Sequence, residues 1–142
     1  MPDIHHSIPI TAPLNRVTAL VSTPEGLREW WAEDVESNPD GKATLGFFNR
    51  STIYRLRPVE RTEQRMVWRC ETGQEWEDTD LVFTIRPQGS GVVLDFVHAH
   101  WREATAYFTS CNTTWGGLMF RLRAAAEGKA PGPLFRSSSL AY

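Results

Sequence analysis

The sequence predicts an α+β domain in which a curved antiparallel sheet wraps around one long C-terminal helix. Three observations predict this architecture. A first strand is followed by two short helical segments, the chain from about residue 33 to residue 98 has the pattern of successive antiparallel strands, and one long helical segment comes after them. With 142 residues, the chain is large enough to bury a core without disulfides or a bound metal.

The opening segment Ile4–Ile10 alternates apolar and polar residues, which is typical of a half-buried strand. Pro13 suits the first turn of the helix that follows. Thr23 can cap a second short helix, and Pro24 suits the first position of that helix. Gly26 lowers the helix propensity of this segment, so we expect packing to hold it in place.

The second helix runs into two adjacent tryptophans, Trp30 and Trp31, in a chain that contains six tryptophans. Neighbouring side chains on one short helix point in different directions, so we do not expect both to enter the core. One of them should anchor the core and the other should gate a cavity. The pattern leaves open which residue has which role.

Turn signals separate the central strands, and they occur at residues 39–41, 71–73 and 87–91. Apolar residues of these segments alternate with polar ones, as expected for a sheet that has one solvated face. The predicted strands are Lys42–Phe48, Ser51–Val59, Met66–Glu71, Thr79–Arg86 and Val92–His98.

The closing helix is predicted from about Glu103 to Glu127, with Gly128 in the position where a left-handed cap is expected. At a rise of about 1.5 Å per residue it would be about 38 Å long, which is enough to cross a sheet. We expect residues 1–128 to form the domain and residues 129–142 to form a C-terminal tail. One stripe of the helix is apolar and consists of Phe108, Cys111, Trp115, Leu118, Met119 and Leu122.

The composition argues against several function classes. A net charge of −2 with 23% charged residues has no nucleic-acid signature, so no nucleic-acid partner is expected. Cys70 and Cys111 lack the spacing of a metal motif, and we expect both to be buried free thiols. No apolar run reaches the roughly 20 residues that span a bilayer, and the polar N-terminus is unlike a signal peptide. We therefore expect a cytoplasmic protein without a membrane span.

The order and spacing of several short motifs resemble one protein family. Ile8–Pro13 followed by Val17 resembles the opening of the START-like superfamily, whose members have the helix-grip fold. Thr23–Leu27 followed by Trp30-Trp31 is similar to the corresponding segment of one branch, the activator of heat-shock-protein-90 ATPase homologue-like proteins. The resemblance extends from Ile4 to about Gly128 and includes Val67-Trp68, Trp76 before Thr79, Phe96–His98, and Thr114-Trp115 with Leu118 and Leu122.

The chain departs from the family pattern in the closing helix. Thr114 stands where the family has a glycine before Trp115, and Gly116-Gly117 follow the tryptophan instead. Each glycine costs a helix about 1 kcal/mol relative to alanine. The pair either marks a kink or a close approach of a ligand or the sheet, or it relieves crowding against Trp115.

The resemblance implies a cavity between the sheet and the closing helix. We predict that this cavity binds a hydrophobic small molecule, either aromatic or lipid-like. No cofactor and no metal are predicted, because His98 and His100 are two residues apart but no third ligand follows at a suitable spacing. The predicted ligand-binding residues are Trp31, Trp76, Phe83, Phe96, His98, Tyr107, Trp115 and Met119.

A binding protein rather than an enzyme is our first interpretation, and two other classes stay open. Polyketide cyclases and aromatases of the wider superfamily suggest an enzyme, with acid–base candidates His98, His100, Glu75, Asp78 and Tyr107. The other class is a protein-interaction module, either a homodimer or a chaperone cofactor-like protein. The chaperone role has less support, because 142 residues leave no room for a second module. Candidate contact residues are the strand residues Phe48, Tyr54 and Val93, which we expect to be exposed, and the tail residues Leu134-Phe135 and Leu140–Tyr142.

Overall fold

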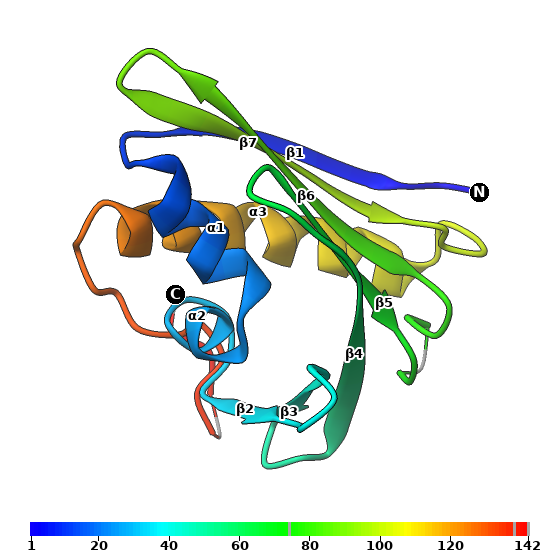
Figure 1. Cartoon of the computed structure of the whole chain (residues 1–142). Helices are drawn as coiled ribbons and strands as arrows, with labels where there is room; N and C mark the ends of the chain where they lie inside the picture. The colour runs from blue at the N-terminus through cyan, green and yellow to red at the C-terminus, as the bar shows by residue number, and fades with distance from the viewer. Residues whose placement is uncertain (74, 138, 142) are drawn as a thin grey trace.

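The structure, a computed structural model, describes residues 1–73, 75–137 and 139–141. In chain order its elements are β1 (Ile4–Ile10), α1 (Leu14–Ser22), α2 (Pro24–Arg28), β2 (Asp34–Ser37), β3 (Ala43–Phe47), β4 (Thr52–Arg61), β5 (Arg65–Cys70), β6 (Asp80–Gln88), β7 (Gly91–Ala99) and α3 (Ala106–Ala126). Seven strands form one antiparallel sheet in the order β1-β7-β6-β5-β4-β3-β2, and α3 lies within its curve (Figure 1). This arrangement confirms the predicted helix-grip fold.

Strand β1 lies at one edge of the sheet and pairs with β7 along its whole length. The pairing runs from Ile4 opposite His98 to Ile10 opposite Val92. Ile4, Ile8 and Ile10 are buried and their neighbours along the strand are more exposed. The predicted alternation is therefore confirmed, and one face of β1 enters the core.

The sheet bends within its longest strand, β4. The pairing of β4 with β5 shifts register between Pro58 and Glu60. Such an irregularity bends and twists the strand that carries it. The far end of β4 pairs with β3, and the short strands β3 and β2 come round beneath α2 (Figure 1). The curve of the sheet therefore encloses a space next to α3.

Helices α1 and α2 pack against each other through a close backbone contact. The Thr23 hydroxyl accepts a hydrogen bond from the Gly26 N–H at 2.9 Å and donates one to the Ala19 carbonyl at 2.9 Å. Pro24 is the first residue of α2, so the predicted cap and helix start are both confirmed. A Cβ atom on Gly26 would lie 2.1 Å from the Ala19 carbonyl oxygen. Packing on α1 therefore requires glycine here, in spite of its low helix propensity.

Helix α3 begins at Ala106 rather than near Glu103, because Thr105 caps it. The Thr105 hydroxyl accepts a hydrogen bond from the Phe108 N–H at 3.2 Å. At the other end Gly128 has a φ of +84°, which is the predicted left-handed cap. The predicted apolar stripe faces the core, with Cys111, Trp115, Leu118, Met119 and Leu122 buried and Phe108 half-buried.

The C-terminal tail folds back along the segment that follows α2. The Phe135 N–H donates to the Trp31 carbonyl at 2.9 Å, and the Glu33 N–H donates to the Phe135 carbonyl at 2.8 Å. Leu134 is buried, with 2% of its surface exposed. The tail is therefore packed on the domain.

Hydrogen bonds from α3 and from the β3–β4 turn also hold the tail in this position. The Arg121 guanidinium of α3 donates to the carbonyls of Pro131 at 3.0 Å and Gly132 at 2.8 Å. The Asn49 N–H, in the turn between β3 and β4, donates to the Ser137 carbonyl at 2.8 Å. The tail thus bridges α3 and the β3–β4 turn.

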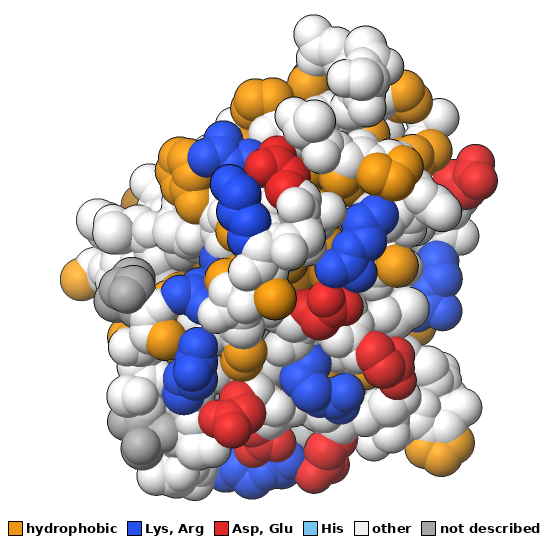
Figure 2. All heavy atoms as spheres, turned by 90° about the vertical axis from the view of Figure 1, so that its left-hand side faces the viewer, with side chains coloured by type: hydrophobic (Ala, Val, Ile, Leu, Met, Phe, Trp, Pro, Cys, Tyr) orange, Lys and Arg blue, Asp and Glu red, His pale blue; other side chains and the backbone are white. Residues whose placement is uncertain are grey.

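The face that carries α1, α2 and the tail has positive and negative side chains interspersed (Figure 2). Arg16 and Glu29 form one such pair at 2.9 Å, and Arg16 also donates to the Ala125 carbonyl at 3.0 Å. Exposed pairs of this kind contribute little to stability. Within the described ranges, no helix is both long and apolar enough to cross a membrane.

Candidate functional site

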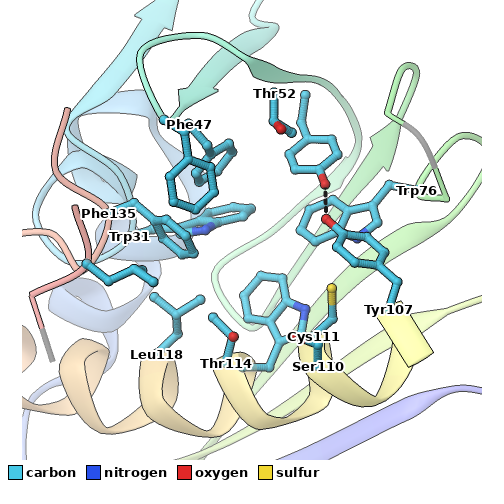
Figure 3. A pocket seen from close by; sticks show the side chains of 14 residues that line it. Trp31, Phe47, Thr52, Trp76, Tyr107, Ser110, Cys111, Thr114, Leu118 and Phe135 are labelled. Atoms are coloured by element: carbon cyan, nitrogen blue, oxygen red, sulfur yellow. Dashed lines mark hydrogen bonds between the residues drawn. The ribbon is translucent and has the colours of Figure 1, made fainter. Parts of the chain in front are cut away.

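A cavity of about 320 Å³ lies between the sheet, α3 and the C-terminal tail (Figure 3). None of the residues described in its lining carries a charge. A hollow in this place is what the family resemblance implied. Trp31, Phe47, Tyr54 and Trp76 form one side, α3 supplies Tyr107, Ser110, Cys111, Thr114, Trp115 and Leu118, and Phe48, Thr52, Phe135 and Leu140 complete the lining.

The aromatic side chains of the lining are in contact with one another. Tyr54 stacks on Trp76, with ring centres 4.1 Å apart and planes inclined by 11°. Trp76 stacks on Trp115 at 5.9 Å, and Trp115 meets Trp31 at 5.0 Å. Phe47 lies 6.1 Å from Trp31 and extends the row. A flat ring bound in the cavity would therefore meet aromatic faces and edges on several sides.

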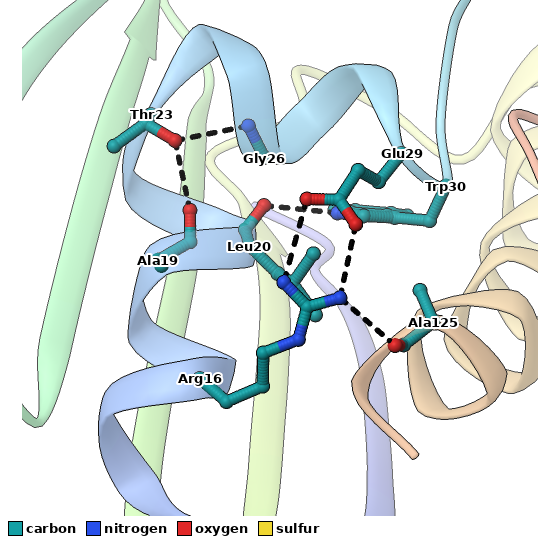
Figure 4. Close-up of polar contacts among 8 residues, drawn as sticks. All are labelled: Arg16, Ala19, Leu20, Thr23, Gly26, Glu29, Trp30 and Ala125. Atoms are coloured by element: carbon teal, nitrogen blue, oxygen red, sulfur yellow. Dashed lines mark hydrogen bonds and ion pairs between the residues drawn. The ribbon is translucent and has the colours of Figure 1, made fainter. Parts of the chain in front are cut away.

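Trp30 and Trp31 are both buried, with 0% and 1% of their surfaces exposed. The expectation that only one of them enters the core is wrong, because α2 ends at Arg28 and both side chains leave from the turn beyond it. The Trp30 indole N–H donates to the Leu20 carbonyl at 2.9 Å, and its ring meets Phe83 edge-on, so Trp30 anchors the core (Figure 4). Trp31 is the one that lines the cavity. Its gating role stays a prediction.

His98 is buried behind the aromatic row and not in the cavity lining. The Trp115 indole N–H donates to His98 Nδ1 at 3.2 Å, so the imidazole proton is on Nε2 and is donated to the Thr79 hydroxyl at 2.9 Å. The Thr79 hydroxyl in turn donates to the Trp76 carbonyl at 2.6 Å. Burial lowers the pKa of His98 to about 3, so the ring is neutral near pH 7. His98 therefore orients Trp115 from behind.

Tyr54 of β4 and Tyr107 of α3 meet at the cavity, and their hydroxyls are hydrogen bonded (Figure 3). Burial raises the pKa of Tyr107 to about 12 and raises the pKa of Tyr54 far above its usual range, so both phenols are neutral near pH 7. The predicted exposure of Tyr54 is wrong, since only 3% of its surface is exposed. In β4, Tyr54 and Leu56 face inward, whereas Arg55 and Arg57 face outward.

Four polar side chains of α3 line the cavity at helical spacing, and these are Tyr107, Ser110, Cys111 and Thr114. Cys111 is a free thiol, and burial raises its pKa, so it is neutral as well. Thr114, which replaces the glycine of the family pattern, points into the cavity (Figure 3). The departure from the family pattern therefore adds a hydroxyl to the lining.

The structure brings four of the predicted ligand-binding residues to the cavity, namely Trp31, Trp76, Tyr107 and Trp115. It places the other four, Phe83, Phe96, His98 and Met119, in the core outside the lining. Phe83 of β6 lies opposite Phe96 of β7, with ring centres 5.0 Å apart, and Phe83 also contacts Trp30. Ligand binding by each of these residues stays a prediction.

Sequence reasoning missed several lining residues, chiefly Tyr54, Ser110, Thr114, Phe135 and Leu140. The inward alternation of β4 was a usable signal for Tyr54. Helical spacing from Tyr107 was a usable signal for Ser110 and Thr114. No local signal exists for Phe135, because the return of the tail decides its place.

The candidate acid–base residues do not converge on one point. His100 and Asp78 are exposed, and Glu75 accepts a hydrogen bond from the Thr105 hydroxyl at 2.6 Å. Of the candidates, Tyr107 is the one that lines the cavity. Among the residues that the structure describes, no group of three His, Cys, Asp or Glu side chains is placed to hold a metal.

A curved antiparallel sheet that wraps around a long helix, with an aromatic cavity beside that helix, defines a START-like protein of the helix-grip fold. Residues 11–127 match the model of the family described as Activator of Hsp90 ATPase homolog 1-like protein. The chain belongs to this family. The match runs from just after β1 to the end of α3.

Solved structures have the same fold. The Aha1 dimer from Colwellia psychrerythraea has a TM-score of 0.77 and 22% identity, over 90% of this chain and 98% of that chain. A protein from Chromobacterium violaceum has a TM-score of 0.72 and 19% identity, over 89% and 99% of the two chains. DynU16, from the dynemicin biosynthetic locus, has a TM-score of 0.72 and 13% identity, over 91% of this chain and 48% of that chain. None of the curated proteins matches the sequence.

Proposed function

We propose that this protein binds a hydrophobic, aromatic small molecule in the cavity between the sheet, α3 and the tail. One observation carries this function: a space of about 320 Å³ whose described lining is mostly aromatic and uncharged. Protein interiors are otherwise packed as densely as organic crystals, and an apolar hollow with a few polar groups is typical of small-molecule sites. Phe135 and Leu140 belong to the lining, so we infer that residues 129–142 act together with the domain 1–128.

Native mass spectrometry of freshly purified protein tests this function. We expect a co-purified organic molecule or, after addition of a panel of aromatic compounds, one-to-one complexes. Thr114→Trp fills the cavity and should abolish these complexes, while Thr113→Trp, on the exposed side of the same helix, is the matched control. If the wild type binds no compound, or if both variants bind equally, the proposal is wrong.

A second candidate function is a cyclase-like or aromatase-like activity. The Tyr54–Tyr107 pair favours it, because neutral phenols can donate hydrogen bonds to a carbonyl oxygen as negative charge develops on it. The likeness to DynU16 adds a structural relative from a biosynthetic locus. A linear poly-β-ketone analogue should then lose the mass of water, and Tyr107→Phe should slow this loss by about 100-fold. An unchanged substrate mass with the wild type would speak against an enzyme.

A homodimer is a third candidate. Phe120 of α3 is 60% exposed, and the Aha1 relative is described as a dimer. Leu134 is buried in its own chain, which removes it from the predicted contact surface, and Tyr142 lies outside the described residues. Sedimentation velocity should show a dimer for the wild type and a monomer for Phe120→Glu. A monomeric wild type at high micromolar concentration would exclude this candidate.

We also propose a cytoplasmic location. Cys70 and Cys111 are free thiols. A reducing compartment such as the cytoplasm keeps cysteines in this state. Fractionation of cells that produce the tagged protein would test the location, and recovery outside the cytoplasmic fraction would contradict it.

A further inference from the structure

We infer that the ligand is a neutral, flat aromatic molecule with its oxygens along one edge, and this inference rests on the proposed function. These oxygens are hydroxyl or carbonyl groups, and the edge that carries them faces α3. The chemical difference between the two walls of the cavity carries this assignment.

One wall is aromatic, and the other, formed by α3, presents most of the hydrogen-bonding groups of the lining beside the apolar side chains of Trp115 and Leu118. On the first wall, Trp31 and Trp76 offer ring faces and edges to a flat apolar body. On the second wall, α3 presents the hydroxyls of Tyr107, Ser110 and Thr114 along one stripe (Figure 3). A ring system with oxygens on a single edge matches both walls at once.

The hydroxyls on the two sides of α3 differ in their bonding. On the outer side, Thr109 donates to the Thr105 carbonyl and Thr113 donates to the Thr109 carbonyl, both at 3.4 Å. On the cavity side, the hydroxyls of Ser110 and Thr114 have no hydrogen-bond partner within the described part of the chain. They are therefore available to a bound molecule or to water.

The tyrosine pair adds a donor at one end of this stripe. Two phenols carry two hydroxyl hydrogens, and the bond between Tyr54 and Tyr107 uses one of them. The second hydrogen is not used by this bond and can be donated to an oxygen of the ligand. Because burial keeps both phenols protonated, this donor is present throughout the neutral pH range.

The absence of charge in the described lining selects a neutral ligand. A carboxylate or an ammonium group placed there would lose its hydration without gaining an oppositely charged partner, which is costly. The size of the cavity is also selective. At about 320 Å³ it lies at the small end of ligand pockets, so it suits a body of about two fused rings with their substituents.

Equilibrium dialysis with four probes tests this ligand class. The probes are naphthalene, 1,8-dihydroxynaphthalene, 1,5-dihydroxynaphthalene and 1-naphthoate. The two diols have the same composition, but only the 1,8 isomer carries both oxygens on one edge. We expect the 1,8-diol to bind about tenfold more tightly than the 1,5-diol and naphthalene, and naphthoate to bind most weakly.

Two conservative variants locate the oxygen-bearing edge. Thr114→Val and Ser110→Ala remove the unpaired hydroxyls with little change of shape. Each should weaken binding of the 1,8-diol by about fivefold and leave binding of naphthalene unchanged. Thr113→Val removes a hydroxyl from the outer side of the same helix and should leave all four affinities unchanged.

The possible failures separate this ligand class from the proposed function. Equal affinities for the two diols, or tightest binding of naphthoate, would overturn the ligand class while leaving a binding cavity in place. An unchanged 1,8-diol affinity in both Thr114→Val and Ser110→Ala would overturn it as well. If none of the four probes binds, the ligand class is wrong, and an empty native mass spectrum in addition would overturn the proposed function.

Discussion

The two ends of the space between the sheet and α3 both contain aromatic side chains, but one end is filled and the other is hollow. At the filled end, beneath α1 and α2, the indole N–H groups of Trp30 and Trp68 donate to the carbonyls of Leu20 and Val21, each at 2.9 Å. At the hollow end, the buried indole N–H of Trp76 has no hydrogen-bond partner among the described residues. The contrast lies in hydrogen bonding as much as in packing.

The elements that cover each end explain this contrast. Helix α1 ends at Ser22, and the last carbonyls of a helix lack partners within it. The two indoles and the Thr23 hydroxyl satisfy three of them. The hollow end is covered instead by the tail and by the β3–β4 turn, in which Phe48, Asn49 and Arg50 all have positive φ, at 53°, 55° and 66°. The filled end is thus the one at which the end of a helix completes the hydrogen bonds of two buried indoles.

The largest effect should come from paired alanine substitutions at the two ends. Trp30→Ala removes a buried ring and leaves the Leu20 carbonyl unpaired, so it should lower the free energy of unfolding by about 4 kcal/mol. Trp31→Ala enlarges a cavity that already exists, so its loss should be about 2 kcal/mol smaller. Urea unfolding followed by circular dichroism measures both. Equal losses would show that the two ends do not differ in packing.

Alanine in place of glycine should act in opposite directions at Gly26 of α2, which covers the filled end, and at Gly116 of α3, whose neighbour Trp115 lines the hollow end. Gly26→Ala forces a Cβ against the α1 backbone and should cost about 3 kcal/mol. Gly116→Ala places a Cβ at an ordinary 3.5 Å from His6 Cε1, so it should stabilise the uninterrupted helix α3 by about 1 kcal/mol. Thermal unfolding of both variants tests the signs. A destabilised Gly116→Ala variant would favour a functional need for glycine on α3.

Acid should unfold the protein partly through His98, which supports the aromatic row between the two ends. Its pKa is about 3 in the native state and about 6.5 when unfolded. The unfolded chain therefore binds a proton that the native protein does not, and the stabilisation, complete above about pH 6.5, falls as the pH decreases toward 3. The slope from this residue should reach about 1.4 kcal/mol per pH unit.

Urea unfolding at a series of pH values measures this slope. His98→Gln should be less sensitive to acid than the wild type, while His5→Gln, at an exposed position, should retain the full slope. Identical slopes for all three proteins would show that His98 is not held neutral.

The smallest effect is expected at the polar contact of the hollow end. Tyr107→Phe leaves the Tyr54 hydroxyl without its partner and should cost about 1 kcal/mol near pH 7. Both phenols have a higher pKa in the native protein than in the unfolded chain. The stabilisation that follows from this difference is complete below about pH 10 and is lost as the pH rises further. Above about pH 10 the variant should therefore lose less stability than the wild type. Parallel alkaline profiles would contradict the raised pKa values.

Local spacing in the sequence predicts the elements and their inward faces, because both depend on neighbours a few residues apart. The alternation of β1, the Thr23 cap and the Gly128 cap are confirmed for this reason. The sequence pattern does not predict the short strand β2 as a separate strand, because its four residues carry only one buried apolar side chain, Val35. Alternation does not distinguish a cavity residue from a core residue. The inner faces of β4 and β6 show the same alternation, but Tyr54 of β4 borders the cavity and Phe83 of β6 lies in the filled end.

Distant contacts decide where the hollow lies. Phe135 reaches the cavity because its backbone pairs with Trp31 and Glu33, about a hundred residues earlier in the chain. The place of His98 behind the lining depends likewise on Thr79, which comes just before β6, and on Trp115 of α3. No spacing within one segment contains this information.

The row of tryptophans has an optical consequence. The ring centres of Trp31, Trp76 and Trp115 are 5.0, 5.9 and 6.2 Å apart in their three pairings. At such separations excitation energy passes between indoles far faster than any of them emits. Light absorbed by one ring of the row is therefore shared by all three, and a quencher that touches a single ring dims them together.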